Sequence, residues 1–325
     1  MENKPKYYFI AVSTKENLAL CIKYGLTGFT NSKNGVWAFM DIKEGDFLSF
    51  IYGARAYNLY RVKKKIAIEN AENLPPWTNI TFKESGKTYY FPFRFELTMV
   101  REFNEPIVRL EFAYIAENLL LRGGYAKTHF QADQTTLQNV SLMGKKFDGK
   151  LDVLRYENAS EFMPKLTFNK IQVNAPYIYK FEELFLQSVI KHNLAINSNI
   201  VKFLEDINFK EALNLNLEIL SERALTQGLI DLLLKESVPI GTSKQIVIEI
   251  KTNKASLKDL NQVSTYVKEI GNECLGGILI AKDFQKKIFP NNTNVKLVKY
   301  NFENLDKQVY DFEELIRILN LSVVS

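Results

Sequence analysis

Five short apolar runs in the second half of the chain most constrain what it can fold into. Each is rich in Ile, Leu and Val, and they occupy residues 215–220, 228–234, 245–251, 275–281 and 295–300. Runs of this length and composition are typical of strands buried within a sheet. Amphipathic stretches at residues 181–193 and 256–270 predict helices beside them. The pattern predicts an α/β domain over residues 176–325, with a central mixed sheet flanked by helices.

The first part of the chain follows a different pattern. Bulky apolar residues alternate with polar ones in short runs, at residues 7–12, 35–40, 46–53, 56–62 and 89–100. Such alternation predicts short strands. We expect helical insertions at residues 14–24 and 111–121. The prediction is an α+β domain over residues 1–140, dominated by a small β-barrel, and a connector at residues 141–175, where the periodicity fades.

Cysteine and histidine are too scarce and too scattered to build a site. Cys21 and Cys274 lie far apart, which excludes a disulfide framework and a cysteine zinc cluster. His129 and His192 lack the spacing of metal ligands, and they offer little to a Ser/His/Asp triad. We therefore expect oxygen atoms to hold any metal.

Charge and hydropathy place the chain in a broad class. The formal net charge of +5 is compatible with a polyanionic partner, although many proteins that bind no nucleic acid share it. No apolar stretch reaches the roughly 18 residues of a membrane span, and the first residues do not form a secretory leader. We expect a cytoplasmic protein without a membrane partner.

Two carboxylates and a lysine lie on two of the predicted strands. Asp231 falls in the second apolar run, and Glu249 and Lys251 end the third. Alternation along a strand places Glu249 and Lys251 on the same face. If the two strands pair, three charged groups converge on an apolar sheet, where unpaired charge is costly.

A hard divalent cation offsets that cost. Mg²⁺ binds one or two carboxylates, with water and substrate phosphate completing its octahedron. We predict that Asp231 and Glu249 bind Mg²⁺, for which Mn²⁺ can substitute. Lys251 would orient the attacking water or stabilise the transition state. Hydrolysis of a phosphodiester is the reaction that this set suits.

Three motifs, in this order, resemble the PD-(D/E)XK nuclease superfamily, in particular its RecB-like and restriction-endonuclease-like branches. They are residues 228–233, the triplet Glu249-Ile250-Lys251 and the Gln-x-x-x-Tyr pair at residues 262–266, and the resemblance covers roughly residues 180–285. It implies a restriction-endonuclease-like fold for the second domain. No proline precedes Asp231, where the name of the family has one.

The resemblance also implies roles for individual residues. It makes Asp231 and the triplet, Ile250 included, the metal-binding segment and Lys251 the catalytic lysine, and it places Gln262 and Tyr266 near the substrate. An acidic residue on the first helix corresponds to Glu183, with its neighbour Glu182 as the alternative. Glu222 is a further acidic candidate on the strand that enters the site, and both Glu183 and Glu222 are candidate metal ligands.

Each of these positions also has a structural interpretation. A Glu-x-Lys triplet is common on exposed strand ends. Gln262 and Tyr266 are four residues apart, so they share a helix face and can form a structural pair against the sheet. Glu222 can be a solvated side chain.

The first domain resembles, less specifically, the PUA-like group that includes EVE and YTH domains. The similarity rests on residues 8–11, 35–38 and 45–52. It implies a pocket that holds a flipped base between aromatic rings. Trp37, Tyr52 and Trp77 are candidates for its walls, and the alternative is that they fill the core.

A glycine turn near residue 123 offers a second nucleic-acid contact. Arg122 and Lys127 flank this loop, which contains an aromatic ring and flexible backbone amides. Such a loop can follow a phosphate backbone, or it can be an ordinary turn.

These features together predict a Mg²⁺-dependent DNA endonuclease of the restriction type, whose first domain recognises DNA, including a modified base. A homodimer would supply the two active sites that double-strand cleavage requires. One alternative is a repair or structure-specific nuclease. Another is a nucleic-acid-binding protein without catalytic activity.

Overall fold

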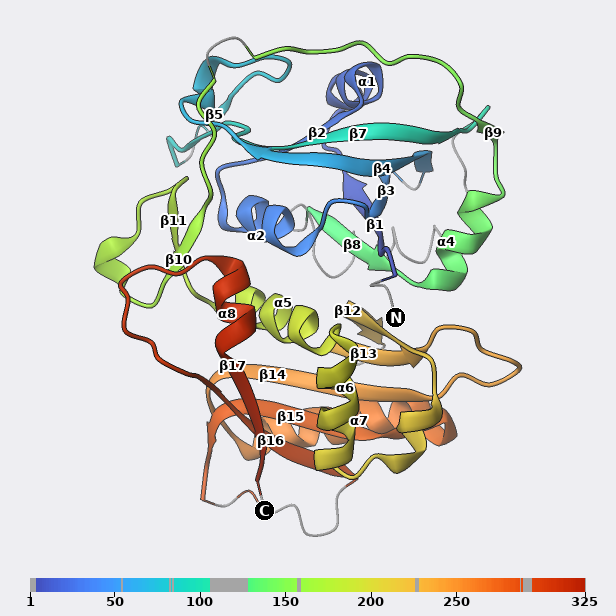
Figure 1. Cartoon of the computed structure of the whole chain (residues 1–325), viewed down its shortest axis with the longest axis vertical. Coiled ribbons are helices and arrows are strands. Elements are labelled where there is room, and N and C mark those ends of the chain that lie inside the picture. Colours follow the sequence, from blue (N-terminus) through green and yellow to red (C-terminus); the bar gives the residue numbers. More distant parts are fainter. Residues whose placement is uncertain are drawn as a thin grey trace. The chain divides into compact units, whose positions relative to one another are not determined.

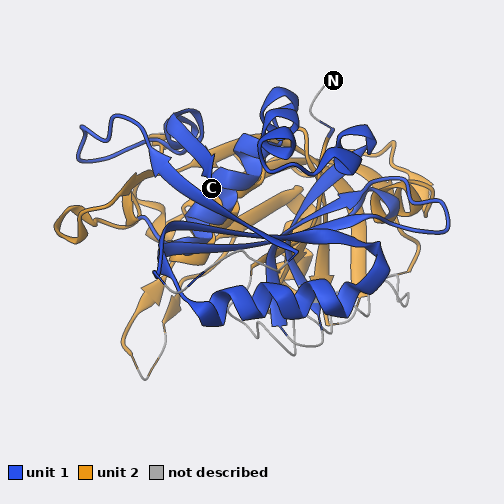
Figure 2. Cartoon of the chain, turned by 90° about the horizontal axis from the view of Figure 1, so that it is seen from below, with its two compact units in different colours: residues 1–4, 133–135, 181–325 blue, residues 5–132, 136–180 orange. Residues whose placement is uncertain are grey.

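The computed structural model describes residues 4–53, 55–81, 83, 85–105, 128–156, 159–225, 228–286, 288 and 294–324. The chain divides into two compact units, coloured separately in Figure 2. Unit 1 comprises residues 1–4, 133–135 and 181–325, and unit 2 comprises residues 5–132 and 136–180. The helix expected at residues 111–121, Arg122 and Lys127 lie outside the described residues.

Unit 1 is built on a mixed six-stranded sheet (Figure 1). Its strands lie side by side in chain order: β12 (Leu217–Leu225), β13 (Gly228–Glu236), β14 (Gln245–Ala255), β15 (Cys274–Phe284), β16 (Val295–Phe302) and β17 (Leu319–Val323). The β14–β15 and β15–β16 pairs are parallel, and the other three pairs are antiparallel. The central strands are apolar because both faces of the sheet are covered.

Helices pack on both faces of this sheet (Figure 2). They are α5 (Glu183–Leu194), α6 (Asn197–Asp206) and α7 (Leu257–Ile270), and α8 (Phe312–Ile318) packs against α5. The predicted helix at residues 256–270 is confirmed as α7, which begins with a capping box. The main-chain amide of Ser256 donates to Asp259 Oδ2 at 2.7 Å, and the Ser256 side chain caps the first turn.

Unit 2 contains a seven-stranded sheet. Its hydrogen-bonded order is β2 (Leu26–Phe29), β7 (Phe93–Glu102), β4 (Arg55–Ala67), β3 (Phe47–Tyr52), β1 (Tyr7–Ala11) and β8 (His129–Ala132), and β9 (Lys145–Lys146) also pairs with β7. The sheet is open over the residues that the structure describes, because its end strands β2 and β8 do not pair with each other. The predicted closed barrel is not found in this part of the chain.

The remaining elements are short. Unit 2 also contains β5 (Ile80–Thr81), β6 (Thr88–Tyr89), β10 (Lys165–Thr167) and β11 (Ile178–Lys180). Its helix α4 (Gln134–Ser141) begins within unit 1. The 3₁₀ turns are η1 (Ala71–Asn73), η4 (Lys170–Gln172), η5 (Lys210–Asn214) and η6 (Gly271–Glu273). No helix in the described parts of the chain is long and apolar enough to cross a membrane.

Two helices lie near the start of unit 2. The helix predicted at residues 14–24 is confirmed as α1 (Lys15–Tyr24), capped by the Thr14 side chain, and it ends at Gly25, whose φ of 56° favours glycine. The strand predicted at residues 35–40 is wrong, because this segment lies in helix α2 (Lys33–Asp41). Residues 35–41 are all buried, so no polar face reveals the helical period.

Candidate active site

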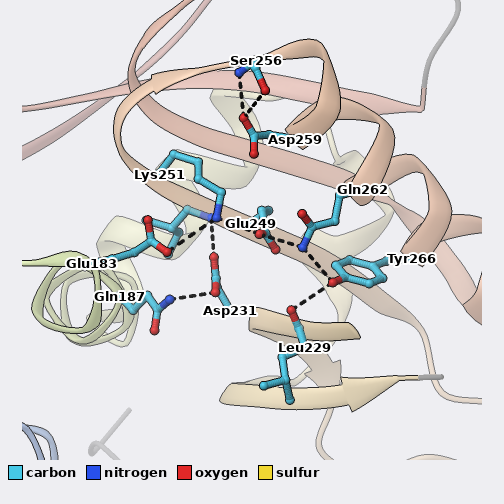
Figure 3. Close-up of polar contacts among 11 residues, drawn as sticks. Glu183, Gln187, Leu229, Asp231, Glu249, Lys251, Ser256, Asp259, Gln262 and Tyr266 are labelled. Atoms are coloured by element: carbon cyan, nitrogen blue, oxygen red, sulfur yellow. Dashed lines mark hydrogen bonds and ion pairs between the residues drawn. The ribbon is translucent and has the colours of Figure 1, made fainter. Parts of the chain in front are cut away.

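Asp231 lies on β13, and donors from two other elements fix its carboxylate. Its Oδ1 accepts a hydrogen bond from Gln187 Nε2 on α5 at 2.7 Å, and its Oδ2 accepts one from the main-chain amide of Ile250 on β14, also at 2.7 Å (Figure 3). The second bond requires the two strands to be neighbours, and β13 does pair with β14. The carboxylate therefore has a defined orientation against the adjacent strand.

Glu249 is the most deeply buried acid of the site, with a side chain 2% exposed. Its Oε1 accepts hydrogen bonds from Lys251 Nζ at 3.0 Å and from Gln262 Nε2 at 3.1 Å. The contact with Lys251 shows that the two side chains project from the same face of β14, as alternation predicts. The other carboxylate oxygen, Oε2, is buried without a hydrogen-bond partner.

Lys251 contacts a second acid on the helix above the sheet. Its Nζ lies 3.5 Å from Glu183 Oε1 and 3.0 Å from Glu249 Oε1. Glu183 is the first residue of α5, and Glu182 is the residue that precedes the helix. Of the two acidic residues considered from the sequence, the structure thus brings Glu183 to the site.

Gln262 and Tyr266 complete the cluster from α7, on the other side of Glu249 (Figure 3). Gln262 Nε2 lies 2.8 Å from the Tyr266 hydroxyl, which donates to the main-chain oxygen of Leu229 at 3.1 Å. A Cβ atom at Gly228 would lie 2.2 Å from this hydroxyl. The glycine before Leu229 therefore allows Tyr266 to approach the β13 backbone.

The charges of the cluster shift the pKa values of its members. Burial, reinforced by the charge of Glu249, raises the pKa of Asp231 well above its ordinary range. Burial also raises the pKa of Glu249, and Lys251 opposes this shift. For Lys251, burial lowers the pKa, but the charges of Asp231 and Glu249 outweigh it and raise the pKa overall. Lys251 therefore remains a cation at neutral pH, and two ionised carboxylates are costly in this place.

The cluster has the donor set that a hard divalent cation requires. The described residues contain no group of three or more His, Cys, Asp or Glu side chains that could hold a metal by themselves. Mg²⁺ needs only one or two protein carboxylates, however, because water and phosphate oxygens complete its shell. The buried Oε2 of Glu249, which has no hydrogen-bond partner, and the raised pKa of Asp231 both fit an additional positive charge at this position.

Glu222 lies on β12, between residues that pair with either side of Asp231. It is half-buried, and its φ of 54° is in the left-handed region, which is unusual for a non-glycine residue. Its role as a metal ligand stays a prediction.

The aromatic candidates of unit 2 differ in exposure. Trp37 is 3% exposed, and its ring centroid lies 4.3 Å from that of His129. Trp77 is 6% exposed and packs against Gly28 and the guanidinium of Arg94. Both are core residues in this structure, the alternative that the sequence left open. Tyr52, at the end of β3, is half-buried.

Gln187 belongs to the cluster, although the sequence did not predict it as a site residue. It lies one helical turn after Glu183 on α5, so both residues point to the same face of the helix. The signal that could have revealed it is a pair of polar residues, four positions apart, on the side of an amphipathic helix that packs on the sheet.

Neither a protein-family model nor a curated protein matches this sequence. Among solved structures, the chain is similar to the structure of an EndoMS-dsDNA2 complex, with 22% identity and a TM-score of 0.19 over 27% of this chain and 36% of that chain. A repair endonuclease from Pyrococcus abyssi has 18% identity and a TM-score of 0.19, over 27% of this chain and 38% of that one. The chain thus spans little more than a third of these two proteins.

A third similar structure is the DNA modification-dependent restriction endonuclease AspBHI. It has 11% identity and a TM-score of 0.21, over 92% of this chain and 76% of that chain.

Proposed function

We propose that unit 1 hydrolyses phosphodiester bonds of DNA with the help of Mg²⁺, as a member of the PD-(D/E)XK nuclease superfamily. The observation that carries this proposal is the convergence of Asp231, Glu249 and Lys251 on one face of a paired β13 and β14. Two carboxylates that are costly to ionise lie beside a lysine that stays charged. The carboxylates can bind a metal, and the lysine can bind a phosphate.

The side chains divide the work of this reaction. Asp231 and Glu249 would hold the cation, with the main-chain oxygen of Ile250 as a further ligand. When bound, Mg²⁺ lowers the pKa of water and offsets charge on the leaving oxygen. Lys251 is a hydrogen-bond donor and cation, so it can orient the attacking water and stabilise negative charge at the scissile phosphate.

Helix α7 supplies a hydrogen bond to Glu249 in addition to that of Lys251. Gln262 donates to Glu249 Oε1, which leaves Oε2 available for a ligand. Tyr266 holds Gln262 in place and is itself anchored to the β13 backbone. We assign both residues to the wall of the site nearest the substrate.

The finer proposal is a restriction enzyme that acts on modified DNA. Unit 2 would recognise the DNA as a PUA-like domain, with half-buried Tyr52 as the candidate for contact with a base. A homodimer would bring two active sites to the two strands. These statements rest on the sequence resemblance.

Cleavage of matched duplexes tests the proposal. Purified protein is incubated with modified and unmodified duplexes, single strands and RNA, each with Mg²⁺ or with EDTA. The proposal predicts that DNA is cut only with Mg²⁺ and that modified duplex is preferred. If every substrate stays intact, the nuclease function is wrong; if both duplexes are cut equally, only the recognition of a modified base is wrong.

A further inference from the structure

Gln187 lies at the site but has no role in the proposed reaction. The side chain is 5% exposed, its Nε2 donates to Asp231 Oδ1 at 2.7 Å, and its Oε1 is buried without a hydrogen-bond partner (Figure 3). Leaving a buried acceptor unsatisfied costs roughly 1–3 kcal/mol. An apolar side chain of the same size would avoid this cost but would leave Asp231 Oδ1 without its donor, so the amide serves its hydrogen bond to Asp231.

We propose that Gln187 is a positioning residue that holds Asp231 in the orientation needed to bind a divalent cation. This inference rests on the proposed function. A carboxylate rotates about its Cβ–Cγ bond, and the amide of Ile250 fixes only one of its oxygens. Gln187 fixes the other from a different element, so the plane of the carboxylate is set before the metal arrives.

The neutrality of the amide is part of the argument. On the same helix, Glu183 lies beside the cation Lys251, whereas the uncharged Gln187 lies beside the carboxyl group of Asp231. An ammonium at position 187 would neutralise Asp231 and compete with the metal, and a carboxylate would repel it. An amide donates a hydrogen bond without adding a charge, so the carboxylate of Asp231 stays available to the metal.

Residues that orient metal ligands have measurable effects on affinity. Removal of such an outer-shell hydrogen bond typically weakens metal binding by about 10–100-fold. Gln187→Met preserves the approximate size of the side chain and removes the donor. Asn193→Ala is a matched control, because Asn193 is a buried amide on the same helix that donates instead to the main-chain oxygen of Ile316, at 3.0 Å.

The test is a titration of the metal-free, full-length protein with Mn²⁺. The electron paramagnetic resonance signal of the free ion measures how much Mn²⁺ is bound. We expect the dissociation constant of Gln187→Met to rise about 10-fold or more, and that of Asn193→Ala to stay at the wild-type value. Near-ultraviolet circular dichroism checks that each variant is folded. Gln187→Leu is a second variant without a donor, for use if the methionine variant does not fold.

Asp231→Ala distinguishes failure of the positioning role of Gln187 from failure of the proposed metal site. If Asp231→Ala weakens Mn²⁺ binding and the folded Gln187 variants do not, the positioning role is overturned and the metal site stands. Equal weakening in Asn193→Ala would also overturn it, because the effect would then come from α5 as a whole. Wild-type affinity in Asp231→Ala would show that the proposed metal site itself is wrong.

Discussion

The carboxylate of Asp231 accepts a hydrogen bond from the main-chain amide of Ile250, at 2.7 Å. This contact joins β13 to the strand that carries Glu249 and Lys251. The two acids therefore come together through strand pairing, and their geometry depends on the sheet more than on a loop. A site built on rigid strands keeps its geometry when no ligand is bound.

Replacement of Asp231 by Asn should stabilise the metal-free protein while it abolishes cleavage. The folded protein raises the pKa of Asp231, so it retains a proton that the unfolded chain releases. The stability contribution of this group is complete below the unfolded pKa and is lost as the pH rises above it. In EDTA, Asp231→Asn should thus melt above wild type at pH 8, and the difference should shrink towards pH 4.

Thermal unfolding across this pH range, with circular dichroism as the signal, measures the effect. A variant that melts below wild type at pH 8 would show that the buried carboxylate is not a net cost in the metal-free protein.

Gly228→Ala should disturb Tyr266 directly. The new Cβ would lie 2.2 Å from the Tyr266 hydroxyl, so the ring should shift and its hydrogen bond to Leu229 should weaken. Overpacking of this kind typically costs about 1–3 kcal/mol. We expect reduced stability and reduced cleavage, because Gln262 loses its support.

A double-mutant cycle tests that explanation. Tyr266→Phe removes the atom that the new Cβ would meet, so Gly228→Ala should cost less free energy of unfolding in the Phe background than in wild type. Equal costs in the two backgrounds would contradict the predicted clash.

Glu218 should make stability fall between about pH 4.5 and pH 7. Burial raises its pKa to about 7, although the main-chain amide of Gln134 donates to it and opposes the shift. The folded state then holds a proton over this range that the unfolded state has lost, so the stability contribution disappears as the pH rises. Glu218→Gln cannot ionise, and at pH 8 it should be more stable than wild type by at most about 3 kcal/mol.

The pH dependence of the melting temperature measures this prediction. Glu211→Gln is the control, because it makes the same chemical change at an exposed carboxylate. An unaltered profile in Glu218→Gln would show that this carboxyl ionises normally in the folded protein.

Trp37→Ala should lower stability far more than Tyr52→Ala. Trp37 is buried against His129, and truncation of a buried aromatic side chain costs about 3–5 kcal/mol. Tyr52 is only half-buried, so its loss should be milder. Urea unfolding of both variants compares them, and native stability in Trp37→Ala would favour the base pocket over the core.

The sequence predicted five of the six strands of the unit 1 sheet, because these are short apolar runs with one helix of clear period between them. It missed the edge strand β17, which is not a continuous apolar run. It also placed Glu249 and Lys251 on one face, since strand alternation depends on local geometry alone. Gln187 was missed because its partner, Asp231, is distant in the chain, and only the packing of α5 on the sheet brings them together.

Unit 2 was harder to predict. Helix α2 is buried on every side, so its sequence is as apolar as a strand, and only the cap at Ser32 marks its start. Sheet closure depends on pairing between distant strands, which alternation does not encode. The same limit applies to Trp37 and Trp77, because an aromatic residue in the core and one in a pocket have the same local sequence signal.

Cleavage by two lysine variants tests the central claim most directly. Lys251 and Lys254 lie on the same strand, but Lys251 contacts Glu249, whereas Lys254 pairs with the half-exposed Asp283, away from the cluster. With Mg²⁺ and a duplex that wild type cuts, Lys251→Met should lose at least about 100-fold in cleavage rate, and Lys254→Met should lose little. Equal rates for Lys251→Met and wild type would contradict the claim that this cluster is the active site.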